Sequence, residues 1–390
     1  MPNGFHLNLA KKIKMNEFYT DRSTVEGELC HYKDHFRCKT VLCNCDDDEY
    51  SEFFKYFYQR FDFLGLKKLI GVHYEGEKDK NGKYKPSYKI ELYKDTNKDG
   101  VVNFNDEIIK TPIYSDGDYP AGDFRSPECI ELLKEADIVV TNPPFSLFKD
   151  FLLYLVKYKK KFLIIGRTNF YGFKDVFPLL KDNRVWTGRS RPSSSKFYVK
   201  NDSFDLQASD NNKITKKGTI ITSINGIRWF TNLKTAYKQP PLDMRGVYYT
   251  PEKYPKYDNY DAINVDKVAD IPCDYPGVMG VPLTFMDKYC PEQFYIEGIS
   301  NSPETLKDIG IIGEKWITLY RQQGGKGHYS ANMKIPVSTI NGRAVSHYNR
   351  IFIKNKKPEN SEQRDRMGQR VVLPKIFVAK LASSVTKKAA

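Results

Sequence analysis

The strongest constraint on the fold is the alternation of apolar, strand-like segments with helical patterns between about residues 25 and 180. Strand-like segments are found at 39–44, 69–72, 136–141 and 162–165. Helical patterns lie between or after them, at 25–36, 46–63, 126–135, 146–157 and 174–180. Strands that alternate with helices form parallel sheets with right-handed crossovers. We therefore expect an α/β domain whose ligand lies at the carboxyl ends of the strands.

The segment 75–122 interrupts this alternation because it is polar and rich in turn residues. Its sequence Asp95-Thr-Asn-Lys-Asp-Gly100, followed by Asp106, has the spacing of a calcium-binding loop. The flanking segments 88–93 and 107–111, however, have strand patterns, which favour a β-hairpin with a Lys-Asp-Gly turn. Calcium binding stays open as the alternative, and it would stabilise the insertion without taking part in chemistry.

Positive charge is concentrated in the C-terminal part of the chain. The 390 residues include 62 Lys and Arg against 48 Asp and Glu, a formal net charge of +14. Residues 301–390 alone hold 17 basic and 6 acidic residues. Basic surfaces attract phosphates, and the 27 Tyr and 24 Phe supply flat side chains on which bases stack. Nucleic acid is therefore the expected partner, and a solvated basic tail is the alternative.

Several classes of protein are excluded. No apolar run approaches the roughly 18 residues of a membrane span, and the N-terminal residues lack the pattern of a secretory signal. The seven cysteines are irregularly spaced, which argues against a disulfide framework. Since there is no Cys-x-x-Cys pair, a zinc site is also not expected. We expect a cytoplasmic protein with no membrane partner and no metal.

The tetrapeptide Asn142-Pro143-Pro144-Phe145 directly follows the strand-like segment that ends at Thr141. Two consecutive prolines impose a stiff, extended loop. The side-chain oxygen of Asn142 and the carbonyl of Pro143 could together accept both hydrogens of one amino group, while Phe145 offers a face on which a heterocycle can stack. The arrangement suits an amine attached to a planar group, and an ordinary proline turn is the alternative.

This tetrapeptide resembles the catalytic motif of S-adenosylmethionine-dependent amino-methyltransferases, which modify adenine N6, cytosine N4 or glutamine amides. Further segments narrow the resemblance to the EcoRI-type DNA adenine-N6 methyltransferases, namely 16–20, 41–47, 53–57, 64–69, 117–124, 137–145, 229–233 and 270–282. The resemblance extends from about residue 11 to residue 300 and is most specific up to residue 170. It implies a Rossmann-like methyltransferase sheet with helices on both faces, a hairpin insertion and a basic C-terminal recognition region.

The resemblance assigns S-adenosylmethionine binding to Phe18, Tyr19, Thr20, Asn44, Asp46, Asp123 and Phe124. The first three precede the first strand, the next two follow it, and the last two form an Asp-Phe pair that contacts the adenine of the cofactor. This chain departs from most methyltransferases at the end of the first strand, where Cys43-Asn-Cys-Asp-Asp47 replaces a Gly-x-Gly turn. The missing glycines also argue against a dinucleotide-binding enzyme.

The implied chemistry requires neither a nucleophilic residue nor a metal, and its catalytic residues are Asn142, Pro143, Pro144 and Phe145. Asn142 and the Pro143 carbonyl would hold the N6 amine of an adenine that has flipped out of the duplex and stacks on Phe145. We expect a catalytic domain at 11–235, including the insertion 75–122, and a target-recognition region at 236–390. The residues expected to contact DNA are Arg321, Lys326, Arg343, Arg350, Lys356 and Lys357.

The expected activity is site-specific methylation of double-stranded DNA by a monomer, in a restriction-modification or an orphan role. A cognate endonuclease would act on the same site without binding this chain. An RNA or protein-glutamine methyltransferase with the same tetrapeptide, and a catalytically silent DNA-binding protein, are the alternatives.

Overall fold

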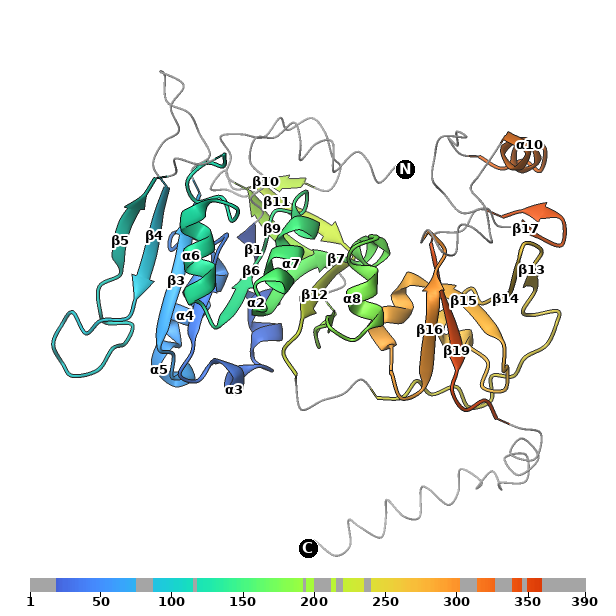
Figure 1. Cartoon of the computed structure of the whole chain (residues 1–390), viewed down its shortest axis with the longest axis horizontal. Helices are drawn as coiled ribbons and strands as arrows, with labels where there is room; N and C mark the ends of the chain where they lie inside the picture. The colour runs from blue at the N-terminus through green and yellow to red at the C-terminus, as the bar shows by residue number, and fades with distance from the viewer. Residues whose placement is uncertain are drawn as a thin grey trace, which may run out of the picture. The chain divides into compact units, whose positions relative to one another are not determined.

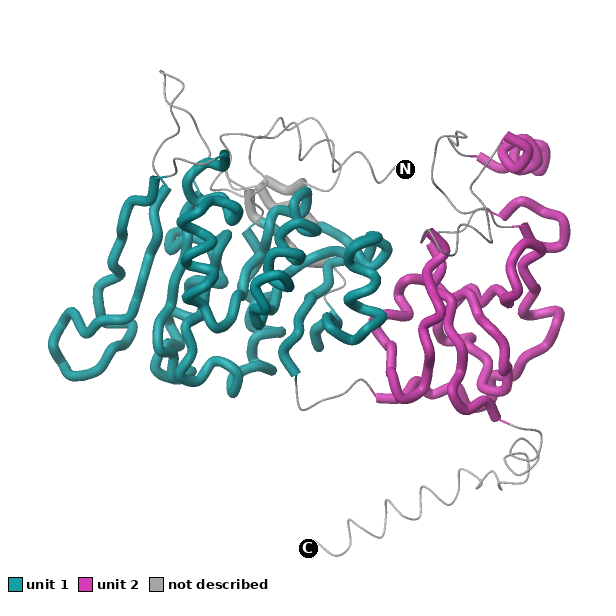
Figure 2. Tube along the Cα trace, in the orientation of Figure 1, with its two compact units in different colours: residues 1–238 teal, residues 239–390 magenta. Residues whose placement is uncertain are grey.

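The computed structural model describes residues 19–74, 87–114, 118–191, 194–199, 212–214, 220–234, 240–301, 314–326, 339–345 and 349–359. The chain forms two compact units, residues 1–238 and residues 239–390 (Figure 2). This division lies close to the boundary expected between residues 235 and 236. Phe18 lies outside the described residues.

Unit 1 is built on an eight-stranded sheet with the strand order β5-β4-β3-β2-β6-β7-β12-β8 (Figure 1). Its strands are β2 (Thr40–Cys43), β3 (Lys68–His73), β4 (Ser87–Leu92), β5 (Ile109–Ile113), β6 (Ile138–Thr141), β7 (Lys161–Arg167), β8 (Trp186–Thr187) and β12 (Ile227–Thr231). The four central strands β3, β2, β6 and β7 are parallel, as the alternation predicts. The outer strands pair antiparallel, so the sheet is mixed. Antiparallel neighbours need no crossover helix, which is why the alternation alone does not reveal them.

Helices cover both faces of this sheet. They are α2 (Arg22–Leu29), α3 (Lys33–Phe36), α4 (Glu52–Gln59), α5 (Phe61–Leu64), α6 (Pro127–Glu135), α7 (Phe148–Lys157), α8 (Phe177–Lys181) and the 3-10 helix η1 (Thr168–Gly172). On one face, α2 to α5 pack against alternate side chains of the strands in a single core cluster. On the other face, which carries α6 and α7 at the front in Figure 1, Phe148 contacts Phe230 with ring centroids 4.9 Å apart. A sheet covered on both faces explains the continuously apolar strands.

Several helix boundaries differ from the sequence expectation. The pattern at 25–36 forms two helices, α2 and α3, although Val25, Leu29, Tyr32 and Phe36 are all buried as predicted. The acidic run 46–48 does not begin the next helix. Instead, the Ser51 hydroxyl accepts hydrogen bonds from the N–H groups that open α4, so the helix starts at Glu52.

The insertion is a β-hairpin, as expected from its flanks, because β4 and β5 pair antiparallel. In the loop between them the Asp106 carboxylate accepts backbone N–H bonds from Thr96, Asn97 and Asn103 at 2.6, 3.1 and 2.8 Å. These oxygens stabilise the turn through the loop's own backbone. No group of three or more His, Cys, Asp and Glu side chains in the described residues is arranged to hold a metal ion.

A second sheet of unit 1 carries the N-terminal motif. Its order is β1-β9-β11-β10, with β1 (Tyr19–Thr20), β9 (Ser194–Val199), β10 (Asn212–Ile214) and β11 (Ile220–Asn225). All its pairs are antiparallel, and Thr20 lies opposite Phe197. The sheet thereby joins residues 19–20 to a strand that is far away in the sequence.

Unit 2 contains a five-stranded sheet with the order β13-β14-β15-β19-β16. Its elements are β13 (Lys256–Tyr257), β14 (Tyr260–Asn264), η3 (Val268–Asp270), β15 (Val278–Pro282), η4 (Leu283–Lys288), β16 (Phe294–Ile299), α10 (Glu314–Gln322), the hairpin strands β17 (Thr339–Ile340) and β18 (Arg343–Ala344), and β19 (Arg350–Asn355). The strand β19 lies between β15 and β16 and is almost entirely buried, with Lys354 as its exposed residue. No helix in the described residues is long and apolar enough to span a membrane.

Candidate active site

The carboxyl ends of β2 and β6 form one edge of the central sheet. The two strands are adjacent and parallel, with Val41 opposite Ile138. The segments that follow Cys43 and Thr141 therefore leave the sheet together, and the Cys45 N–H donates to the Thr141 hydroxyl at 3.1 Å. Asn44 and Asn142, which were predicted on separate motifs, accordingly lie at the same edge.

Asp46 connects these two strand ends. One carboxylate oxygen accepts from the Ser51 hydroxyl at 2.6 Å, and the other accepts from the Thr141 hydroxyl. The backbone N–H of Asn142 also donates to this carboxylate. Burial raises the pKa of Asp46 to about 7, against the opposing effect of these hydrogen bonds. Because protein groups already engage both oxygens, any contact with a cofactor would have to share them.

Tyr19 reaches the same edge through Asp47. The Tyr19 hydroxyl lies 3.4 Å from one oxygen of the Asp47 carboxylate, and His73 Nδ1 lies 3.2 Å from that oxygen. The Tyr19 and Tyr50 rings are 5.5 Å apart. No sequence motif gives Asp47 or His73 a role, and the only signal for them in the sequence is their position at the ends of predicted strands.

The buried oxygens Asn44 Oδ1, at this edge, and Thr20 Oγ1, in β1 of the second sheet, have no hydrogen-bond partner among the described residues. Both side chains belong to residues that are only 2% exposed. Leaving a buried polar atom without a partner costs about 1–3 kcal/mol, and a bound ligand is one way to supply the missing bond. Thr20 and Asn44 therefore fit a cofactor that carries amino or hydroxyl donors.

The tetrapeptide forms the link from β6 to α7. The Pro144 carbonyl accepts from the Leu147 N–H at 2.9 Å, which begins the turn into the helix. No hydrogen bond reaches the Pro143 carbonyl within the part of the chain that the structure describes. Pro143 is buried, whereas Asn142, Pro144 and Phe145 are half-buried. This carbonyl remains available as an acceptor, as the sequence pattern suggests.

Two further aromatic side chains hold Phe145. Its ring centroid lies 6.2 Å from that of Phe170 in η1 and 6.1 Å from that of Phe197 in β9, both in edge-to-face arrangements. Phe197 is fully buried and lies opposite Thr20 in the second sheet. The tetrapeptide and residues 19–20 thus meet through a strand to which the sequence analysis assigned no role, since no local pattern distinguishes Phe197 from a core phenylalanine.

Asp123 and Phe124 lie beside the helix that follows the tetrapeptide. The Arg125 guanidinium donates to both Asp123 oxygens at 2.9 and 2.7 Å, and this hydrogen bonding raises the pKa of Arg125. Phe124 is 4% exposed and packs edge-on against Phe151 and Tyr154 of α7. The pair is therefore fixed against α7, with Phe124 largely enclosed by protein.

Four of the six expected DNA contacts are exposed on unit 2, and they are Arg321, Lys326, Arg343 and Lys357. Arg321 and Arg343 belong to one small module, because α10 and β18 pack together through Trp316, Ile317 and Ala344. The Ala344 N–H donates to the Gln323 side chain at 3.1 Å. The stacked Trp316 and Tyr320 rings, 5.0 Å apart, stiffen the same helix.

The other two expected DNA contacts are engaged inside unit 2. The Lys356 ammonium donates to the Pro291 carbonyl at 2.6 Å and lies 4.3 Å from the centre of the Tyr295 ring. The Arg350 side chain is 10% exposed and lies 3.4 Å from Asp266. Arg350 was expected to contact DNA, but it lies in the buried strand β19, and this position suits a structural role better than a phosphate contact.

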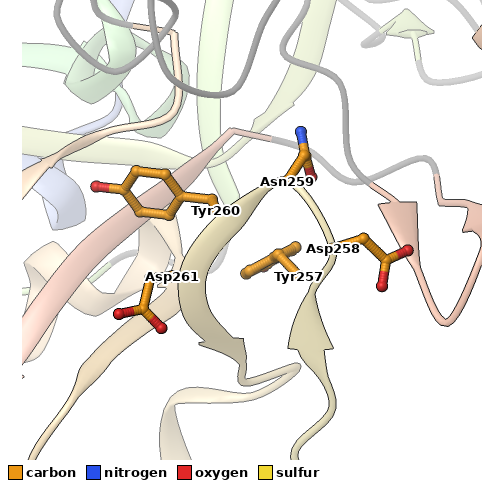
Figure 3. A pocket seen from close by; sticks show the side chains of 5 residues that line it. All are labelled: Tyr257, Asp258, Asn259, Tyr260 and Asp261. Carbon is orange, nitrogen blue, oxygen red and sulfur yellow. The ribbon is translucent and has the colours of Figure 1, made fainter.

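A surface hollow of about 500 Å³ lies at the turn between β13 and β14 (Figure 3). It is lined by Tyr257, Asp258, Asn259, Tyr260 and Asp261. The Asp258 carboxylate points toward the β17–β18 hairpin, where it accepts from the N–H groups of Asn341 and Gly342. The two aspartates in the lining make the hollow unsuitable for a phosphate. We therefore assign Asp258 the role of supporting the β17–β18 hairpin.

Comparison with known proteins places this chain in a family. Residues 6–356 match the family described as adenine-specific methyltransferase EcoRI. The type II methyltransferase M.EcoRI of Escherichia coli is 44% identical over 317 residues, which cover 79% of this chain and 93% of that protein. M.MgeORF184P of Mycoplasma genitalium and M.MpnI of Mycoplasma pneumoniae are each 39% identical over 306 residues, covering 78% of this chain and 89% of each relative. No solved structure matches the chain. Since the family match covers most of the sequence, the chain belongs to the EcoRI family of adenine-specific methyltransferases.

Proposed function

We propose that this adenine-specific DNA methyltransferase methylates N6 of an adenine that has left the double helix, with S-adenosylmethionine as the methyl donor. The observation that carries the proposal is one edge of the central sheet. That edge combines Asn142 and the Pro143 carbonyl with the buried, unpartnered oxygen of Asn44. Thr20, whose buried oxygen is also unpartnered, joins them through Phe197, which lies opposite it and contacts Phe145. The acceptors for the target amine, Asn142 and the Pro143 carbonyl, therefore lie close to buried oxygens that could accept hydrogen bonds from the cofactor.

The cofactor would be held by Tyr19, Thr20 and Asn44, together with Asp123 and Phe124. Phe18 and Asp46 were expected in the same set. The buried oxygens of Thr20 and Asn44 fit the amino and hydroxyl donors of an amino acid and a ribose. Bound there, the cofactor would supply an electrophilic methyl group on a sulfonium.

The chain's own groups would act by orienting the target amine. The Asn142 side-chain oxygen and the Pro143 carbonyl would accept the two N6 hydrogens and stabilise the positive charge that develops on the nitrogen. Phe145 would support the flat face of the adenine, while Phe170 and Phe197 restrict rotation of its ring. An adenine inside a duplex is paired and stacked, so its N6 reaches this loop only after base flipping.

Replacing Asn142 tests the proposal. We expect Asn142→Ala to reduce methyl transfer by about 10²–10³-fold, the typical effect of removing one polar group that stabilises transition-state charge. DNA binding should persist, because the side chain contacts only the flipped base. Transfer of a radiolabelled methyl group to duplex DNA measures the first effect, and a DNA-binding titration measures the second.

Asn105→Ala, in the exposed hairpin loop, is the matched control and should leave the rate unchanged. Near-normal turnover of Asn142→Ala would contradict the proposed role. Methylation-aware sequencing of DNA from cells that express the chain identifies the modified atom. Methyl transfer to RNA or to protein glutamine in preference to DNA would favour the alternative amino-methyltransferases.

We further propose that unit 2 recognises double-stranded DNA and that the enzyme acts as a monomer. The exposed residues Arg321, Lys326, Arg343 and Lys357 support the first statement. A cognate endonuclease would act on the same DNA site without binding this chain. Sedimentation of the protein with and without DNA tests the monomer, since a dimer on one site would double the protein mass in the complex.

A further inference from the structure

Asp46 lies where four elements of unit 1 meet. It follows β2, and its carboxylate contacts Thr141 at the end of β6 and Ser51 at the start of α4. Its backbone carbonyl accepts from the N–H of Val72, near the end of β3, at 3.2 Å. Asp46 is therefore held from several sides and cannot move without disturbing the strand ends that carry the site.

Three donors converge on the Asp46 carboxylate, and one of them belongs to the catalytic tetrapeptide. They are the hydroxyls of Ser51 and Thr141 and the backbone N–H of Asn142. The hydroxyls can rotate toward other acceptors, whereas the direction of the N–H is set by the backbone. Asp46 consequently constrains the residue whose side chain would accept the target amine.

Burying this carboxylate is costly for the fold. Asp46 is 5% exposed and forms no salt bridge within the described residues. Desolvation raises its pKa to about 7. A neutral side chain would fill the site at a lower desolvation cost, so the presence of the acid suggests a functional demand for its acceptor oxygens.

We propose that Asp46 is a positioning residue for methyl transfer, whose carboxylate fixes the backbone of Thr141 and Asn142 and thereby aims the Asn142 side chain at the target amine. This role differs from the cofactor contact expected from the sequence. It rests on the proposed function of Asn142.

The substitution Asp46→Asn keeps the size of the side chain but replaces one acceptor oxygen with an amide nitrogen. The new amide nitrogen is itself a donor, so it cannot accept the hydrogen bond that the replaced oxygen accepted. We expect the single-turnover rate at saturating substrates to fall by about 10- to 100-fold, the loss that a misplacement of the order of 1 Å produces. The affinity for S-adenosylmethionine, measured by calorimetry, should change by less than about threefold, well under one kcal/mol.

Asp137→Asn is the matched control. Asp137 precedes β6, at the opposite end of that strand, and accepts from the Thr40 N–H at 2.9 Å. It therefore supports the same two strands without contacting the tetrapeptide, and its substitution should leave the rate unchanged. An unchanged rate in Asp46→Asn would overturn the proposal. A weakened cofactor affinity with a normal rate at saturation would also overturn it, in favour of a direct cofactor contact.

A pair of substitutions at Thr141 decides the matter if Asp46→Asn does not fold. Thr141→Val removes the hydroxyl at nearly constant volume, whereas Thr141→Ser retains it. We expect the valine variant to lose rate and the serine variant to recover most of it. A valine variant with the wild-type rate would overturn the proposal.

The outcomes separate this inference from the proposed function on which it rests. If Asn142→Ala is active, the proposed function fails. If Asn142→Ala is inactive while Asp46→Asn and Thr141→Val retain the full rate, only the positioning role fails. In a folded Asp46→Asn background, adding Thr141→Val should cost less rate than it costs in the wild type, because the Asp46–Thr141 contact is common to both changes and only the Cys45–Thr141 bond is lost in addition. Additive losses would contradict a shared pathway.

Discussion

At the scale of single residues, the edge of the sheet combines groups that destabilise the fold with groups that serve the site. Thr20 and Asn44 keep buried oxygens without partners among the described residues, and Asp46 is a carboxylate in a desolvated position. Each arrangement costs free energy of folding. The occurrence of three such groups around the catalytic tetrapeptide agrees with a functional site.

The raised pKa of Asp46 predicts how stability depends on pH. The folded-state pKa of about 7 lies above the ordinary value of 3.8, so the folded protein binds this proton more tightly than the unfolded chain. The stabilising contribution is therefore complete below the unfolded pKa and is lost as the pH rises through about 7. Asparagine has no such dependence, so Asp46→Asn should gain stability relative to the wild type between about pH 4.5 and pH 8.

Urea unfolding of both proteins at the two pH values measures this difference. Ionisable groups that do not interact with Asp46 titrate alike in both proteins and cancel in the comparison. A constant difference in the free energy of unfolding would show that the acid is not desolvated as described. If Asp46→Asn is more stable and slower than the wild type, Asp46 lowers the stability of the fold while it raises the rate of methyl transfer.

At the scale of elements, strands predicted from apolar runs lie where expected, whereas the polar turns between them do not follow local rules. The acids 46–48 are favourable at a helix N-terminus, yet Asp46 turns inward and Ser51 caps α4. The preference of an acid for a helix end is worth about 0.3–1 kcal/mol, less than the contacts available at the strand edge. The local pattern therefore predicted the strands correctly but did not predict the contacts that Asp46 makes in the turn after β2.

The strand β9 provides an element-scale test. Phe197→Leu removes one of the two rings that hold Phe145, so we expect methyl transfer to slow by about tenfold through lost orientation. Phe36→Leu is the matched control, because Phe36 is equally buried and its ring contacts Phe57. Both variants should lose about 1 kcal/mol of stability. Equal rates in the two variants would show that β9 has only a structural role.

At the scale of the whole molecule, charge and chemistry occupy different units. The catalytic tetrapeptide and the residues of the sheet edge lie in unit 1, whereas the basic residues 321, 326, 343 and 357 lie in unit 2. We expect substitutions in the two units to change different kinetic quantities. Those in unit 2 should alter DNA affinity, and those in unit 1 should alter the rate at saturating DNA.

The double substitution Arg321→Ala with Arg343→Ala tests this division. Each lost phosphate contact should reduce the slope of log affinity against log salt by about one, so we expect a reduction of about two. The single-turnover rate at saturating DNA should stay within about twofold of the wild type. Unchanged salt slopes would refute the placement of DNA contacts on the α10–β18 module. Glu314→Ala, at the opposite end of the same helix, is the control for nonspecific effects on α10.

By itself, the sequence determined the parallel centre of the sheet, the hairpin insertion and the family. Apolar runs and turn residues act locally, and the tetrapeptide carries its chemistry in four consecutive residues. Only the tertiary structure decided that Asp46 engages the Asn142 backbone, that Phe197 holds Phe145, and that Arg350 is buried. The first two are contacts between residues distant in the chain. The burial of Arg350 follows from the position of β19 between two other strands. Desolvation and hydrogen bonding depend on which groups meet in space, and no local pattern contains that information.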